Sequence, residues 1–148
     1  AFEHARAYAQ ERVQFDRPLA EFQAIQFKLA EMANRISGAR ALAGLAAEAL
    51  EGSLAGEGAS DVGRLSPGEV DPEAPSAGAL AAMAKLTATE AAVWITKEAV
   101  QIYGGYGYMR DYPVEKLLRD AKGTEIYEGT NEIMRLVVAR EVLRGAGA

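Results

Sequence analysis

The sequence predicts an all-α protein, an up-and-down four-helix bundle with a short additional helix. Apolar residues recur at spacings of three and four along most of the chain, and no segment reads convincingly as a strand. Glycine or proline separates the periodic stretches. With 148 residues, 49% of them hydrophobic, the chain is long enough to bury a core, and we expect one domain over residues 1–148.

The amino-terminal part predicts two helices separated by a proline. The first is expected over residues 1–14, with four apolar residues on one face: Phe2, Ala5, Ala9 and Val13. It should end at Asp16-Arg17-Pro18, because proline disfavours helical backbone in the residue before it. A long helix is then expected over residues 19–50, whose apolar seam is typical of a helical bundle.

Residues 51–77 have a different composition from the rest of the chain. They hold five glycines, four serines and three prolines, which favours a flexible loop. They also hold six acids and one base, so this segment accounts for the whole net charge of −5. We expect a flexible acidic insert here, without an assigned function.

The carboxy-terminal half predicts three further helices. A long one is expected over residues 78–102, and three glycines end it: Gly104, Gly105 and Gly107. A short one is expected over residues 112–122, where Pro113 suits the first turn. The last should begin at Thr130, a good N-cap residue, and run to residue 143.

The composition argues against several classes of function. The chain has no cysteine and a single histidine, His4, so we expect no disulfide and no metal site. It has no basic face with interleaved aromatic residues, so we expect no nucleic-acid partner. No apolar run approaches the roughly 20 residues of a membrane helix, and no signal pattern opens the chain.

Glu128 is the first candidate for chemistry. It lies in a Tyr127-Glu128-Gly129-Thr130 turn between two helical patterns. An acid in a turn is most often a solvated surface group. Here Ile126 and Tyr127 form an apolar shoulder, and a bound acyl chain would desolvate the carboxylate and raise its proton affinity. The free N–H groups of the helix that follows favour a phosphate or a polar cofactor edge.

Two other motifs suit an anionic ligand. In Gln101-Ile-Tyr-Gly-Gly105 the glycine pair allows backbone to approach a pyrophosphate, although a plain helix stop explains it equally well. In Glu11-Arg12-Val-Gln14-Phe15 the planar guanidinium can engage two phosphate oxygens, although an arginine at a helix end is usually a solvated charge. Phe22 and Gln23 follow, and plain core packing would account for Phe22.

Together and in this order, the three motifs resemble the carboxy-terminal domain of flavin-dependent acyl-CoA dehydrogenases, and the resemblance covers nearly all of the chain apart from residues 51–77. It implies that Glu128 is the catalytic base that removes the α-proton of an acyl-CoA. The β-hydrogen then leaves as hydride to FAD, and the product is a trans-2-enoyl-CoA. It implies that Gly129 contacts the substrate. It also implies an FAD site with these residues: Arg12, Gln14, Phe15, Phe22, Gln23, Gln101, Gly104, Gly105, Thr130, Asn131 and Glu132.

The resemblance implies that this chain is part of a larger enzyme. Family members also have an amino-terminal helical domain and a middle β domain, they form homotetramers that bind FAD between subunits, and they pass electrons to an electron-transfer flavoprotein. We therefore expect a role in fatty acid β-oxidation, in the bacterial cytoplasm or in a mitochondrial matrix, and no activity from the isolated chain. Asp16, where the family often has glycine, and Gly123, where it has a larger residue, depart from the pattern.

Two other functions stay open at this point. A glutaryl-CoA dehydrogenase, which also decarboxylates its substrate, would share these motifs. A non-catalytic helical assembly module would use the same fold, but its expected feature is loss of the carboxylate at position 128, where this chain has Glu128.

Overall fold

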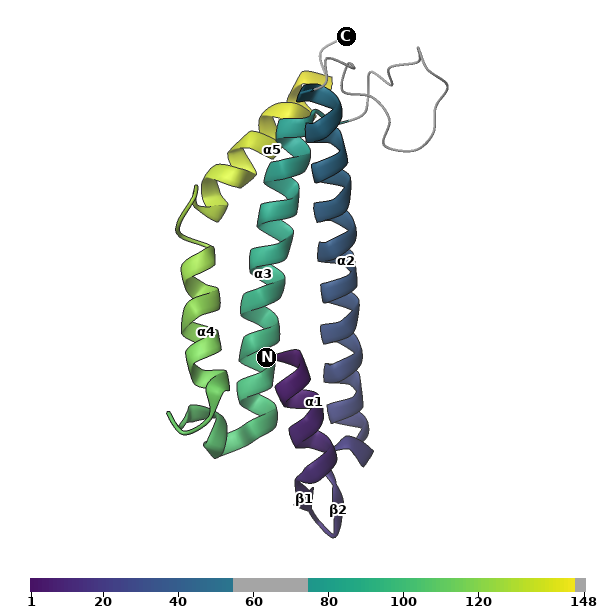
Figure 1. Ribbon diagram of the computed structural model, residues 1–148, viewed down its shortest axis with the longest axis vertical. Coiled ribbons are helices and arrows are strands. Elements are labelled where there is room, and N and C mark those ends of the chain that lie inside the picture. Colours follow the sequence, from purple (N-terminus) through teal and green to yellow (C-terminus); the bar gives the residue numbers. More distant parts are fainter. Residues whose placement is uncertain (55–74, 146–148) are drawn as a thin grey trace. The chain divides into compact units, whose positions relative to one another are not determined.

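The computed structural model describes residues 1–54 and 75–145 (Figure 1). These residues form five α-helices: α1 (Phe2–Glu11), α2 (Gln23–Leu54), α3 (Ala77–Tyr103), α4 (Pro113–Thr124) and α5 (Asn131–Gly145). Two short 3₁₀ helices, η1 (Leu19–Glu21) and η2 (Gly104–Tyr108), and two strands of two residues each, β1 (Val13–Gln14) and β2 (Arg17–Pro18), complete the described part. The predicted all-α class is confirmed. None of these helices is long and apolar enough to cross a membrane.

The chain divides into two compact units. The first consists of Ala1–Ser37 and Thr89–Tyr127, and the second of Gly38–Ala88 and Glu128–Ala148. Both long helices therefore contribute one part to each unit.

The first unit is held together by buried apolar residues and by a partly buried ion pair. Ala5 and Ala9 of α1, Met32 of α2 and Val114 of α4 are completely buried. Lys28 of α2 donates a hydrogen bond to Glu98 of α3. Closer to the middle of both helices, the Arg35 guanidinium lies 4.3 Å from the centre of the Trp94 ring. From the first contact to the second, the residue number increases on α2, from Lys28 to Arg35, and decreases on α3, from Glu98 to Trp94. The two helices therefore run antiparallel in this unit.

The second unit packs α2 and α3 through small side chains. Ala46 of α2 and Leu80 and Ala84 of α3 form its buried cluster, with Leu42 and Ala49 packed against it. Such small residues let two helix backbones approach closely. Near the start of α5, Lys85 of α3 donates to Asn131. Near the end of α5, the backbone N–H of Ser76, the residue before α3, donates to the Glu141 carboxylate over 2.8 Å.

The prediction for the end of the first helix was wrong. The helix ends at Glu11, and Val13–Gln14 pairs with Arg17–Pro18 in an antiparallel two-residue hairpin. Its turn residues Phe15 and Asp16 have φ values of 51° and 62°, the left-handed pair that a type I′ turn requires. Phenylalanine is rare in such a turn, which is why the sequence did not predict a hairpin here.

The long second helix also differs from its prediction at both ends. Residues 19–21 form η1, Phe22 is extended, and α2 begins only at Gln23. It then continues to Leu54, four residues past the predicted end at residue 50 and into the predicted insert. Leucine and glutamate favour a helix, and one Gly52 costs only about 1 kcal/mol. Residues 55–74 of the predicted insert lie outside the described residues.

Candidate functional site

The turn around Glu128 has an uncommon backbone. Glu128 has a φ of 53° and the next residue, Gly129, a φ of 90°, so two successive residues are left-handed. For an L-residue this conformation costs about 1–2 kcal/mol, and strain of this kind concentrates at functional sites. The positive φ is what favours glycine at position 129, because the Met134 methyl carbon, 2.7 Å from where a Cβ would lie, is the end of a flexible side chain and could move aside.

The Glu128 side chain is exposed. Among the described residues it makes no hydrogen bond and no ion pair, so its carboxylate is available to a ligand. The two residues before it are the predicted apolar shoulder, and both are largely exposed, Ile126 to 61% and Tyr127 to 58%. Apolar side chains left in water next to an unpaired acid are suited to cover an apolar ligand.

The residues after Gly129 build the start of α5. The Ile133 N–H donates to the Thr130 hydroxyl over 3.4 Å, at the long end for a hydrogen bond, which confirms Thr130 as the N-cap. Asn131 is only 4% exposed, and its Oδ1 accepts a hydrogen bond of 2.7 Å from Lys85 Nζ. Glu132 is exposed in the first turn, where an acid interacts favourably with the helix dipole.

Lys85 was not among the residues singled out from the sequence. A signal was present, because it is the only charged residue between Ala77 and Thr89, in a helical segment made mostly of alanine, leucine and methionine. A lone charge in such a segment needs a polar partner.

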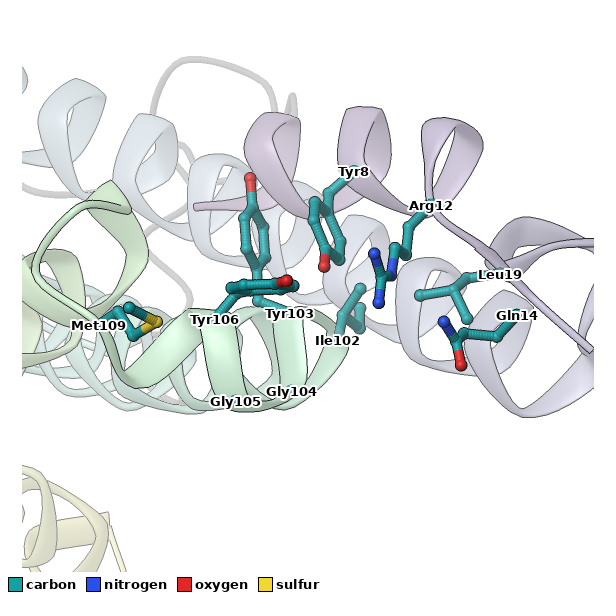
Figure 2. A pocket seen from close by; sticks show the side chains of 10 residues that line it. All are labelled: Tyr8, Arg12, Gln14, Leu19, Ile102, Tyr103, Gly104, Gly105, Tyr106 and Met109. Atoms are coloured by element: carbon teal, nitrogen blue, oxygen red, sulfur yellow. The ribbon is translucent and has the colours of Figure 1, made fainter.

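A cavity of about 550 Å³ lies in the first unit, where the end of α1 faces the end of α3 (Figure 2). This volume is in the range of small-molecule sites. The lining residues are Tyr8, Arg12, Gln14, Leu19, Ile102, Tyr103, Gly104, Gly105, Tyr106 and Met109. Four residues of the predicted cofactor site are thus brought together: Arg12, Gln14, Gly104 and Gly105.

Tyrosines form much of the wall of this cavity. The rings of Tyr8 and Tyr103 stack with their centres 3.9 Å apart, and the Tyr103 hydroxyl donates to the His4 carbonyl over 3.3 Å. The Arg12 guanidinium lies 5.4 Å from the centre of the Tyr106 ring. In Figure 2, Tyr8 and Arg12 reach from α1 toward the end of α3. These tyrosines were not among the residues predicted from the sequence, although Tyr8 and Arg12 are four residues apart and therefore share the face of the predicted helix.

The glycine pair exposes backbone to the cavity. A Cβ at Gly104 or Gly105 would meet no atom within 4 Å, so the space beside both residues is open. Gly104 has a φ of 60° and ends α3, whereas Gly105 has an ordinary backbone. Side chains are therefore absent at the place where the predicted phosphate contacts would be made.

The other predicted cofactor residues of this unit do not line the cavity. Phe15 lies at the hairpin turn, is 86% exposed and meets the Phe22 ring edge-on at 6.2 Å. The guanidinium of Arg17 lies 4.0 Å from the centre of the Phe22 ring. Gln23 and Gln101 are exposed. These side chains can meet a ligand only outside the cavity itself.

Burial raises the pKa of both stacked tyrosines. For Tyr8 burial is the largest cause, and the nearby Arg12 partly offsets it. For Tyr103 burial is again the largest cause, and Tyr8 and Glu11 add to it. Both hydroxyls therefore stay protonated above the pH at which an ordinary tyrosine ionises.

This shift predicts a loss of stability at alkaline pH. In the unfolded chain these tyrosines ionise near pH 10, while in the folded chain they still hold their protons, so stability falls as the pH rises above about 10. Tyr103→Phe removes one of the two groups and should make the fall shallower. The check is the thermal midpoint of both proteins from pH 8 to pH 11, and parallel curves would contradict the prediction.

A family model and two similar relatives agree on one protein family. The family model for the carboxy-terminal domain of acyl-CoA dehydrogenase matches residues 1–143. An acyl-CoA dehydrogenase of Bacillus subtilis is 50% identical over 145 residues, 98% of this chain and 33% of the relative. An acryloyl-CoA reductase (NADH) of Anaerotignum propionicum is 46% identical over 137 residues, 93% of this chain and 29% of the relative.

A solved structure agrees with these relatives. Butyryl-CoA dehydrogenase from Megasphaera elsdenii superposes with a TM-score of 0.77 at 40% identity, over 97% of this chain and 32% of that one. The chain thus spans about a third of the length of the proteins it matches.

Proposed function

Because this chain belongs to the acyl-CoA dehydrogenase family and forms its carboxy-terminal domain, we propose that the protein containing it dehydrogenates acyl-CoA thioesters to trans-2-enoyl-CoA, with Glu128 as the base. The observation that carries the proposal is the Glu128 turn. It presents an unpaired carboxylate on a left-handed backbone, directly before the capped start of α5. Gly129 beside it is exposed and has no side chain that would obstruct the thioester.

The task of Glu128 is to take a proton from carbon. The α-proton of a thioester is weakly acidic, so the base must be placed close to it and must lose its hydration shell when substrate binds. Glu128 is hydrated in this chain and has no competing partner among the described residues, so an acyl chain lying against Ile126 and Tyr127 would remove its water. Desolvation raises the pKa of a carboxylate and makes it a stronger base.

The cavity of the first unit fits part of an FAD molecule. Arg12 and Gln14 supply donors for phosphate oxygens, the open Gly104–Gly105 backbone permits close approach, and the Tyr8 and Tyr106 rings provide flat apolar walls. We propose that this cavity holds the diphosphate and its surroundings. For the second unit by itself, we propose that Thr130, Asn131 and Glu132 contact the flavin nucleotide. When bound, FAD supplies the acceptor for the hydride that leaves the β-carbon.

Gly105 offers a test of the cofactor site that is separate from folding. Gly105→Ala should fold normally, because the added methyl meets no atom within 4 Å and the backbone is not left-handed. It should weaken FAD binding about tenfold or more, since the methyl occupies the space of the phosphate contact. Titration of the full-length apoprotein with FAD measures this. Gly38→Ala, equally open on α2, is the matched control and should bind as wild type. Equal affinities for FAD in all three proteins would show that the glycine pair does not contact the cofactor.

The rest of the enzyme lies outside this chain. We propose that the isolated chain has no dehydrogenase activity and binds FAD weakly or not at all, because its relatives are about three times longer. Four apolar side chains of α5 are about half exposed or more: Ile133, Leu136, Val142 and Leu143. They are suited to an interface, and we propose a homotetramer that passes electrons to an electron-transfer flavoprotein in a bacterial cytoplasm.

A second candidate is the reverse reaction. The acryloyl-CoA reductase among the relatives acts on an unsaturated acyl-CoA with NADH. By microscopic reversibility, the residue that removes the α-proton in one direction delivers it in the other, so Glu128 would serve both. Glutaryl-CoA decarboxylation would use the same Glu128 and differ in the pocket for the second carboxylate.

Colour distinguishes these functions. The full-length protein should purify yellow and bleach when a short- or medium-chain acyl-CoA is added without oxygen. Bleaching by NADH and not by acyl-CoA would favour the reductase, and release of carbon dioxide from glutaryl-CoA would favour the decarboxylase. A protein that stays colourless after FAD is supplied would be an assembly module, and the proposed activity would be wrong.

A further inference from the structure

We propose that Lys85 is a positioning residue for the Glu128 turn and that it acts through Asn131. The inference rests on the proposed function of Glu128 as the base. It concerns the second unit alone, because Lys85, Asn131 and Glu128 all belong to that unit.

The contact joins two helices at a critical place. Lys85 Nζ on α3 donates to Asn131 Oδ1, the first residue of α5, over 2.7 Å, and 46 positions of sequence separate the two. Asn131 is only 4% exposed, and Lys85 is half-buried. A hydrogen bond with a charged donor is short and strong, and burial shields this one from competing water. This hydrogen bond therefore attaches the start of α5 to α3.

Backbone hydrogen bonds flank the Glu128 turn on both sides, but few side-chain contacts fix its position, so we expect it to depend on the Lys85–Asn131 bond. The Glu128 side chain has no hydrogen-bonding partner among the described residues, so the backbone alone determines where the carboxylate lies. The N-cap bond to Thr130 is long at 3.4 Å and hence weak. Met134 packs against Gly129, but an apolar contact leaves the backbone free to rotate. Asn131 follows Glu128 by three residues, so movement of Asn131 moves the carboxylate.

A lysine is an unexpected choice for this position. The Lys85 ammonium lies at the amino-terminal end of α5. A positive charge is disfavoured there, because the free backbone N–H groups at that end of a helix carry partial positive charge. A half-buried ammonium also costs hydration, and the surrounding segment Ala77–Thr89 has no other charge. If packing were the only requirement, an apolar residue would be more stable at position 85. The polar contact to Asn131 is a reason for a lysine at this position.

The test uses Lys85→Met in the full-length, FAD-loaded protein. Methionine keeps most of the side-chain length but cannot donate to Asn131. The rate of flavin reduction per bound FAD at saturating acyl-CoA should fall about tenfold to a hundredfold, because small displacements of a reacting group have effects of this size. KM and FAD content should stay near wild type, and the isotope effect of an α-deuterated substrate should rise.

One variant of Asn131 and a double variant complete the experiment. Asn131→Leu should reduce the rate as Lys85→Met does, and the double variant should be no slower than either single variant, since the two residues act as one unit.

The outcomes separate this inference from the proposed function. If Glu128→Gln abolishes flavin reduction while Lys85→Met keeps the wild-type rate per bound FAD, the proposed function stands and the positioning role is wrong. The same holds if Lys85→Met only lowers thermal stability or FAD content, or if the two single losses multiply in the double variant. Unchanged flavin reduction in Glu128→Gln would overturn the proposed function and this inference with it.

Discussion

Glu128→Gln in the full-length protein is expected to lower turnover by about 10² to 10⁴ or more, the usual loss when a general base is removed. Glutamine has nearly the same shape but cannot accept a proton from carbon. Folding and FAD binding should be unaffected, because Glu128 is exposed and makes no hydrogen bond or ion pair with the described residues. Anaerobic stopped-flow measurement of flavin reduction by acyl-CoA isolates the step in which the proton is lost.

Two companion variants make this result specific. Glu48→Gln makes the same change of charge at an exposed residue of α2 in the same unit and should reduce flavin at the wild-type rate. Glu128→Asp keeps the carboxylate but withdraws it by one methylene, so it should lie between wild type and Glu128→Gln. A Glu128→Gln protein that turns over as fast as Glu48→Gln would remove Glu128 from its proposed role.

The helices were predictable because their causes are local. Spacing of apolar residues, Pro113 at a helix start, Gly104 at a helix end and Thr130 as an N-cap are all visible in the sequence, and the structure confirms each. The Glu128 turn could also be located from the sequence, because a glycine and an N-cap residue follow the acid directly.

The features that were missed depend on contacts between distant residues. The hairpin at Phe15 and Asp16 needs two left-handed residues that the sequence does not favour, and pairing between β1 and β2 holds them. Neither the Tyr8–Tyr103 stack nor the contact of Lys85 with Asn131 leaves a local signature, because the partners lie 95 and 46 positions apart. Sequence periodicity identifies which face is buried, but it does not identify the partner of a buried polar group.

The pair formed by Lys28 and Glu98 leads to the second large effect. The Glu98 side chain is only 10% exposed and that of Lys28 is 32% exposed, so the carboxylate depends on this cation far more than a surface acid would. Lys28→Met leaves the carboxylate buried and without its main partner. The local free energy of unfolding should fall by about 3 kcal/mol, at the low end for a broken buried pair, because Lys97 Nζ remains 3.9 Å from the other carboxylate oxygen.

Hydrogen exchange in the full-length protein measures this loss where it arises. Peptides that cover the first half of α2 and the second half of α3 should lose protection, because both belong to the unit that contains the pair. Lys97→Met is the control; its side chain is 69% exposed, and its removal should change protection by less than about 1 kcal/mol. The double variant Lys28→Met/Glu98→Leu should regain most of the loss, because an apolar pair removes the unpaired buried charge. If the double variant is as unstable as Lys28→Met, the loss of stability comes from lost packing of the lysine methylenes and not from the unpaired buried carboxylate of Glu98.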